Sequence, residues 1–211
     1  MLTFLKVVGY ILLFFVAWQV LVRVVRHYWH FPAPAIIEVF LNSRFRARLQ
    51  DPRKVIARSG VRPGQQVLEI GCGGGFFLPY AAEAIGPTGK VSGLDIAADM
   101  LERCRKYLDK FPDVKNRIEL LQKSAYELPF ADGSLDVVYL VAALMEIPEP
   151  GRCLAEAKRV LKPDGSLAVT EFLVDPDYPG RRVTIRCRET AGFKVDAIEG
   201  NTWNYTVRFK K

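Results

Sequence analysis

The feature of this chain that most restricts its fold is a short apolar run that passes into a cluster of glycines and then into a helical stretch. Residues 66–71 read QVLEIG, residues 71–75 read GCGGG, and residues 76–86 read FFLPYAAEAIG. This pattern predicts a strand, a tight turn and a helix, because glycines let the backbone turn sharply and approach a ligand without a Cβ in the way. A glycine motif alone is a weak signal, but this context indicates an α/β domain that binds a nucleotide-like ligand.

The residues in and around the loop separate the possible ligands. A dinucleotide fingerprint needs a third glycine where Phe76 stands, and a P-loop would end in GK[ST], which is missing here. Glu69, just before the loop, disfavours a phosphate and suits a cation or an ammonium group. Asp95 ends the next apolar run, residues 90–95, where a carboxylate can accept both ribose hydroxyls. The alternative role of Asp95 is to cap the helix that follows.

Four segments, in order and normally spaced, resemble the class I S-adenosylmethionine-dependent methyltransferases. They are VLEIGCGGG at 67–75, GLDIAADML at 93–101, SAYELPFADGSLDVVYL at 124–140 and RVLKPDGSLAV at 159–169. The resemblance covers about residues 35–211 and is closest to the small quinone-biosynthesis and phospholipid methyltransferases. It implies an α/β, Rossmann-like seven-stranded sheet in the order 3-2-1-4-5-7-6, with strand 7 antiparallel and helices on both faces. It also implies S-adenosylmethionine as the cofactor.

The local patterns agree with that fold. The run at 90–95 is the second strand, and a helix is expected between Pro179-Gly180 and Ala191-Gly192. The ligand is expected beyond the carboxyl ends of strands 1, 2 and 4. The remaining strands are predicted at 118–122, 135–140 and 166–172, and a terminal hairpin at 193–199 and 203–210, joined near Gly200-Asn201.

The resemblance implies cofactor-binding roles for individual residues. Glu69 and the loop backbone would hold the methionine moiety, Asp95 the ribose, and Ile96 would pack on the adenine. Ser124-Ala125 stands where the family often has Asp-Ala, so a neutral hydroxyl replaces a stronger charged acceptor for the adenine amino group. The full set is Glu69, Gly71, Cys72, Gly73, Gly75, Asp95, Ile96, Ser124, Ala125 and Leu140, with Val141 as the alternative to Leu140 for main-chain contact.

The residues that contact the methyl acceptor are harder to assign. Methyl transfer needs the two partners in line and water excluded, and it needs a base only when the nucleophile carries a proton. Many relatives have histidines after strand 4, where this chain has Met145-Glu146-Ile147-Pro148. The candidates are Glu146, Glu171 and Tyr178, with Asp175 and Tyr126 as further ones; each has an ordinary cap or loop role as its alternative. Arginines at 181–188 fit an anionic headgroup or, more commonly, a solvated face.

The amino-terminal segment is strongly apolar. Residues 2–22 are interrupted only by Lys6 and Gln19, and at about 1.5 Å per residue they span about 31 Å, the thickness of a bilayer core. The basic start and small-residue cleavage site of a signal peptide are not visible. We predict a single membrane helix, with a shallow interfacial helix as the alternative because Lys6 and Arg23 shorten the uncharged run. The basic residues that follow place the rest of the chain on the cytoplasmic side.

The chain is thus expected to have three parts: a membrane anchor at 1–29, a linker with an amphipathic segment at 30–60, and a methyltransferase domain at 61–211. The amphipathic stretch at 35–49 would lie on the bilayer surface, on the catalytic domain, or on both. The four cysteines are widely spaced and lack a metal-binding pattern, so we expect free thiols and no metal.

The predicted function is a membrane-anchored methyltransferase whose acceptor is small or lipophilic, such as a lipid headgroup or a quinone-type precursor. The alternatives are a membrane-tethered cofactor-binding scaffold without catalysis, and a methyltransferase for a soluble small molecule or a protein. A nucleic-acid acceptor is not expected, because the run after strand 4, LVAALMEIP, lacks an [ND]PP[YF] signature. The oligomeric state stays open.

Overall fold

The computed structural model describes residues 44–173, 175 and 178–211, together with scattered helical positions between residues 6 and 21. Most of the apolar segment 2–22, the linker at 30–34 and residues 35–43 of the expected amphipathic stretch lie outside the described residues. Within the described part, no helix combines the length and the apolar character that crossing a membrane requires.

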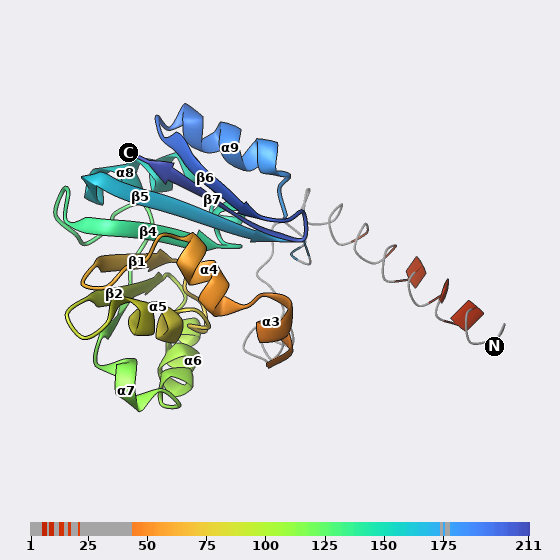
Figure 1. Cartoon of the computed structure of the whole chain (residues 1–211), viewed down its shortest axis with the longest axis horizontal. Coiled ribbons are helices and arrows are strands. Elements are labelled where there is room, and N and C mark those ends of the chain that lie inside the picture. The colour runs from red at the N-terminus through yellow and green to blue at the C-terminus, as the bar shows by residue number, and fades with distance from the viewer. Residues whose placement is uncertain are drawn as a thin grey trace.

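The core of the structure is one seven-stranded sheet in the order β3-β2-β1-β4-β5-β7-β6 (Figure 1). All neighbouring strands pair in parallel except β7, which runs antiparallel to both β5 and β6. The predicted sheet order and the reversed strand are therefore confirmed. The strands are β1 Gln66–Ile70, β2 Lys90–Asp95, β3 Ile118–Gln122, β4 Leu135–Val141, β5 Leu161–Phe172, β6 Lys194–Gly200 and β7 Asn204–Lys210.

The central strands β1 and β4 are buried almost along their whole length. Their continuous apolar runs fit strands that are covered on both faces, which is typical of parallel sheets. The predicted bounds of β2 and β3 are confirmed, but β5 begins at Leu161 rather than at residue 166. Leu161 pairs with Leu135 across an irregularity in β4, so the strand begins directly after α8, which ends at Val160.

Helices cover both faces of the sheet and separate two apolar clusters. The first cluster packs α4 Pro52–Arg58, α5 Leu78–Ile85 and α6 Ala98–Leu108 on one face. The second packs α8 Pro150–Val160 and α9 Arg181–Thr190 on the other. Fully burying one of their large aliphatic side chains contributes roughly 1.5–3 kcal/mol. The short elements are α3 Arg44–Leu49, α7 Pro112–Lys115 and the 3-10 turn η1 Leu144–Glu146.

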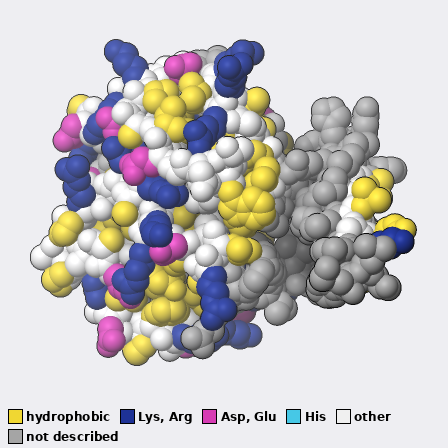
Figure 2. Space-filling model, turned by 45° about the vertical axis from the view of Figure 1, so that its right-hand side comes forward, with side chains coloured by type: hydrophobic (Ala, Val, Ile, Leu, Met, Phe, Trp, Pro, Cys, Tyr) yellow, Lys and Arg dark blue, Asp and Glu magenta, His cyan; other side chains and the backbone are white. Residues whose placement is uncertain are grey.

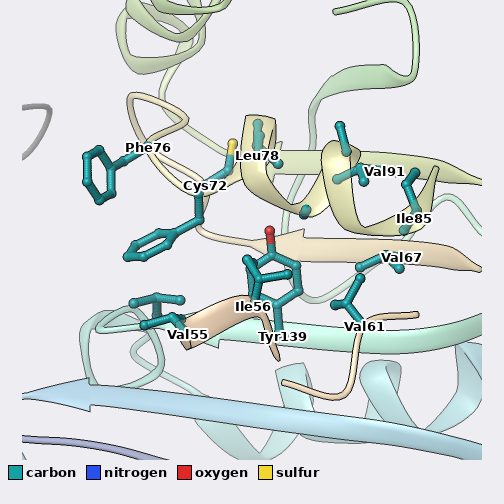
Figure 3. Packing of buried hydrophobic residues seen from close by; sticks show 14 of the residues in the cluster. Val55, Ile56, Val61, Val67, Cys72, Phe76, Leu78, Ile85, Val91 and Tyr139 are labelled. Atoms are coloured by element: carbon teal, nitrogen blue, oxygen red, sulfur yellow. The ribbon is translucent and has the colours of Figure 1, made fainter. Parts of the chain in front are cut away.

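The packed domain includes residues that precede position 61, where the sequence predicts its start. Val55 and Ile56 of α4 are fully buried in the first cluster, and Figure 3 shows them beside Tyr139 of β4. The helix begins after Asp51, whose carboxylate accepts the N–H of Arg53 at 3.0 Å. Helix α4 therefore packs against the sheet as part of the first cluster.

The terminal hairpin confirms the turn predicted near residue 200. Gly200 has a φ of 94°, and the Asn201 side chain accepts the N–H groups of Trp203 and Asn204, both at 2.9 Å. Since Asn204 pairs with Phe172 at the end of β5, this turn lies at the carboxyl edge of the parallel strands. The predicted ligand site lies at the same edge.

Candidate active site

The glycine loop is held against the end of β2 by main-chain hydrogen bonds. The N–H groups of Gly71 and Cys72 both donate to the carbonyl of Leu94, at 2.8 and 3.0 Å. Gly71 has a φ of 72°, and a Cβ there would stand 2.7 Å from the Cβ of Ala143. An added Cβ at Gly73 would meet nothing within 4 Å, so the loop backbone faces open space at this point. The loop thus forms a cradle in which a ligand can approach the main chain.

Asp95 lies next to this cradle at the end of β2. Its carboxylate accepts the N–H of Gly73 at 2.8 Å with one oxygen and the N–H of Ala97 at 2.9 Å with the other. The second bond satisfies the residue before α6, as in the capping role considered from the sequence. Each carboxylate oxygen keeps a further lone pair. Both expected roles, helix entry and ribose binding, are therefore compatible in one side chain.

Glu69 is buried beneath the loop, at the centre of the sheet. The hydroxyl of Tyr139, on the neighbouring strand β4, donates to its carboxylate at 2.9 Å. Burial raises the pKa of Glu69 to about 8, although the bond from Tyr139 and the charge of Arg46 act in the opposite direction. A buried acid that is poised near neutrality responds strongly to a cationic ligand, because the ligand's charge favours the ionised form.

Arg46 of α3 is the neighbour that the sequence did not point to. It is buried, its guanidinium lies 5.0 Å from the ring centre of Phe76 and 5.1 Å from that of Phe77, and it donates to Gln50. Burial lowers its pKa to about 10, so the group stays charged at neutral pH. In the amphipathic stretch predicted at 35–49, a charged residue is expected on the polar side, and for Arg46 this expectation is wrong because the side chain is buried. Stacking on the two phenyl rings and attraction to the Glu69 carboxylate stabilise the guanidinium in the interior.

The end of β4 forms the other wall of the site. The side chain of Leu140 is fully buried in the second cluster, so only its main chain can reach a ligand, as the resemblance implies. Ala142 follows with a φ of 51°, and its N–H donates to the carbonyl of Thr170 at 2.9 Å. A left-handed alanine is uncommon and marks local strain. Nothing in the sequence signals it, because alanine carries no preference for that conformation.

The predicted adenine side lies along the ends of β2 and β3. Ile96 is 74% exposed, which leaves its apolar surface open to a ring. The Ser124 hydroxyl accepts the N–H of Tyr126 at 3.2 Å, and Ala125 packs on the second cluster. The N–H of Lys123 donates to the carbonyl of Asp95 at 3.3 Å, so this segment lies close to the ribose candidate. The structure therefore brings the predicted cofactor residues to one edge.

The side chain of Cys72 is buried, so its predicted contact with the cofactor would be made by its backbone. The thiol is buried, and the neighbouring Cys104 together with burial raises its pKa well above the usual range. The protonated sulfur packs between α6 and the loop, which agrees with the purely main-chain role implied for this residue.

The residues predicted to contact the methyl acceptor differ in their exposure and in the partners of their side chains. Glu146 is exposed in η1, beyond the end of β4. Glu171 is buried 3.8 Å from the guanidinium of Arg188, so its carboxylate faces α9 rather than solvent. The Tyr178 hydroxyl donates to the carbonyl of Thr202 at 2.6 Å.

The two further candidates also differ. Asp175 acts on the pKa of Arg46, which places it near the loop side of the carboxyl edge. The Tyr126 hydroxyl accepts the N–H of Glu149 at 3.0 Å, and Arg152 stacks on its ring. Glu146 follows the end of β4 and Asp175 follows the end of β5, so both lie at the carboxyl edge of the sheet. The acceptor roles stay predictions.

This chain is similar to known proteins both in sequence and in fold. Residues 68–169 match the family model described as a methyltransferase domain. A solved S-adenosylmethionine-dependent methyltransferase of Aquifex aeolicus superposes with a TM-score of 0.77 at 25% identity, over 84% of this chain and 98% of that one. The chain contains an S-adenosylmethionine-dependent methyltransferase domain. S-adenosylmethionine is the cofactor of this class, and the open glycine cradle, the free lone pairs of Asp95 and the buried acid Glu69 fit it.

Two curated relatives are similar to this chain in sequence. The ubiquinone/menaquinone biosynthesis C-methyltransferase UbiE of Ectopseudomonas mendocina is 36% identical over 149 residues, which is 70% of this chain and 56% of the relative. The demethylmenaquinone methyltransferase of Listeria welshimeri is 40% identical over 120 residues, 57% of this chain and 50% of the relative. The chain spans about half the length of these curated relatives.

Proposed function

We propose that this protein is a membrane-anchored methyltransferase that transfers the methyl group of S-adenosylmethionine to a lipophilic acceptor of the quinone-precursor type. A lipid headgroup is the second acceptor class. The observation that carries the proposal is the carboxyl edge of the sheet, where the cofactor cradle and exposed apolar side chains occur together. The relatives named for quinone methylation support the first acceptor class.

The protein's part in the reaction is to position two molecules and to exclude water. Bound S-adenosylmethionine supplies a methyl group that its sulfonium already activates. Asp95 would accept the ribose hydroxyls while its bond to the Gly73 N–H keeps the loop in place. Glu69, oriented by the Tyr139 hydroxyl, would stabilise the positive charge of the methionine moiety.

The acceptor side of the same edge has an apolar and an acidic component. Met145 is exposed next to the cradle wall formed by Ala143. Its side chain suits an apolar ring or chain. Glu146 is the exposed carboxylate beside Met145. Methylation of a ring carbon releases a proton from that carbon, and Glu146 is our candidate to accept it.

The proposed anchor is the apolar segment at 2–22. The positions described within it are helical, and Tyr10, Leu13 and Phe14 expose 71%, 67% and 71% of their surface. Exposed apolar side chains of this kind fit a lipid environment. The basic residues after the segment favour a cytoplasmic location for the methyltransferase domain. An acceptor dissolved in the bilayer would then reach the carboxyl edge without crossing water.

Labelled cofactor tests the proposal directly. The full-length purified chain is incubated with S-adenosylmethionine that is labelled in its methyl group and with a total membrane lipid extract, and the products are separated by solvent extraction and chromatography. We expect label in an apolar aromatic fraction. Label in protein or nucleic acid alone would overturn the lipophilic acceptor, and cofactor binding without any transfer would favour a scaffold.

A matched pair of variants assigns the activity to the cradle. Asp95→Asn removes the charge that faces the ribose, and we expect cofactor affinity to fall about 10- to 100-fold, the range of a lost charged hydrogen bond. Asp99→Asn removes the same charge from the exposed first turn of α6 and should leave affinity unchanged. Equal losses in both variants would contradict the ribose role.

A further inference from the structure

Helix α9 presents a basic surface that the methyltransferase site does not use. Of its four arginines, Arg188 is 0% exposed and turns inward to Glu171. Arg182 and Arg186 are exposed one helical turn apart on the outer side. Val183, between them in sequence, is 52% exposed. The outer side of α9 thus combines two cations with an apolar side chain.

The β6–β7 turn extends this surface. Arg181 donates to the carbonyl of Gly200 at 3.2 Å, which fixes the turn to the start of α9. Trp203 follows in the turn; it rests edge-on against Phe172, with 5.9 Å between the ring centres, and is still 43% exposed. We call Arg182, Val183, Arg186 and Trp203 the α9–turn surface.

The surface borders a hollow between α8 and α9. This hollow has a volume of about 650 Å³, and small or apolar side chains form its floor. In the described residues, the lining contains two arginines and no acidic side chain, and the first turn of α9 also lacks an acidic residue. The upper part of Figure 2, where Figure 1 has α9, shows apolar side chains interspersed with Lys and Arg and with some acidic side chains. The lining residues are Gly151, Ala155, Arg182, Val183, Arg186, Cys187 and Ala191.

We propose that the α9–turn surface docks on an anionic membrane surface and turns the carboxyl edge of the sheet toward the bilayer. Exposed tryptophan is enriched at membrane interfaces, and arginines are attracted to anionic lipid headgroups. Charge complementarity favours lipid phosphates over an uncharged apolar partner, and the protein's net charge of +7 acts in the same direction. The inference rests on the proposed membrane anchoring and is independent of which acceptor is methylated.

The consequence for the site is geometric. The start of α9 and the β6–β7 turn both lie at the carboxyl edge, because Asn204 pairs with Phe172 at the end of β5. The cofactor cradle lies at the same edge. Docking through the α9–turn surface therefore keeps the carboxyl edge, where the acceptor would bind, close to the lipid. An anchor alone would leave the domain free to rotate.

Fluorescence of Trp203 tests the contact. The chain has three tryptophans, so a full-length Trp18→Phe/Trp29→Phe variant retains Trp203 as the single fluorophore. The variant is reconstituted into phosphatidylcholine vesicles with and without phosphatidylglycerol, and quenching by lipids brominated near the headgroup end of the chain is measured. We expect quenching in the anionic vesicles and little in pure phosphatidylcholine.

Arg182→Gln/Arg186→Gln in this background should weaken docking on the order of 25-fold, about fivefold for each arginine. The matched control, Lys106→Gln/Lys110→Gln, removes the same charge from the opposite face of the sheet, where both lysines are exposed. It should leave quenching intact.

Three outcomes would overturn the inference. They are an unquenched Trp203 in vesicle-bound protein, equal effects of the two double variants, and a change of oligomeric state in Arg182→Gln/Arg186→Gln, which would assign the surface to a second copy. Vesicle flotation and cofactor binding are followed in the same samples. Protein that floats and binds cofactor while Trp203 stays unquenched refutes only the docking surface, whereas protein that does not float refutes the anchor as well.

Discussion

The two halves of the sheet carry different kinds of polar residue at the same edge. In the β1–β2 half, the Asp95 carboxylate and the Leu94 carbonyl accept main-chain N–H groups of the glycine loop, and Gly73 faces open space. In the β5–α9–β7 half, Glu171 is closed off by Arg188, and Tyr178 is turned to the hairpin. Asp95 therefore faces the cradle, whereas Glu171 at the end of β5 is paired with an arginine inside the core.

The largest expected effect tests whether Glu171 is structural. Arg188→Met leaves the buried carboxylate without its ion-pair partner, and removing one member of a buried pair costs about 3–5 kcal/mol. Denaturant unfolding should show this loss. Arg182→Met, on the exposed side of the same helix, should change the free energy of unfolding by less than about 0.5 kcal/mol. Comparable small effects in both variants would contradict a structural ion pair and would favour an acceptor-contacting role for Glu171.

The second effect tests the close packing of Gly71 in the glycine loop. Gly71→Ala places a Cβ on a left-handed residue and 2.7 Å from the Cβ of Ala143, so we expect a loss of about 2–3 kcal/mol in unfolding free energy together with weaker cofactor binding. Gly151→Ala, where nothing lies within 4 Å, is the control and should be neutral or slightly stabilising. A stable Gly71→Ala protein with normal affinity would refute the close approach of the two loops.

A pH series tests the buried acid of the cradle. Because burial raises the pKa of Glu69 to about 8 from 4.5, the folded state holds this proton more tightly than the unfolded chain. Its stabilising contribution is full below about pH 4.5 and is lost as the pH rises toward 8. Between pH 6 and 8 we expect wild type to lose about 1–2 kcal/mol relative to Glu69→Gln.

Cofactor binding should follow the opposite trend. A cationic ligand favours the ionised carboxylate, so affinity should fall by up to about tenfold per unit as the pH drops below 8. Isothermal titration at several pH values measures both the affinity and the proton released. A pH-independent affinity in wild type, with Glu69→Gln unchanged, would show that Glu69 does not sense the ligand's charge.

The smallest expected effect concerns the adenine side. Ser124→Asp restores the acidic residue that related sequences often carry, and a charged acceptor should tighten cofactor binding roughly fivefold. Ser124→Ala should change affinity little beyond the loss of the bond to the Tyr126 N–H. No gain in Ser124→Asp would mean that this position does not face the adenine amino group.

The sequence by itself determined the positions of the strands and of the glycine turn. These depend on local signals: apolar runs, the Gly71–Gly75 turn, and Asp95 at a strand end. The sheet order and the reversed last strand followed from the family resemblance. The resemblance to a known family supplied the long-range order that periodicity alone cannot supply.

Only the tertiary structure decided which polar side chains are covered. In the sequence, Arg46 and Arg188 look like ordinary charged residues and Glu171 looks like an acceptor-contacting candidate, and all three are buried by contacts with other elements. Likewise, α4 joins the core, and Ala142 adopts a left-handed conformation because the packed ends of β4 and β5 hold its N–H on Thr170. Burial depends on the sum of many distant contacts, and no local pattern in the sequence records that sum.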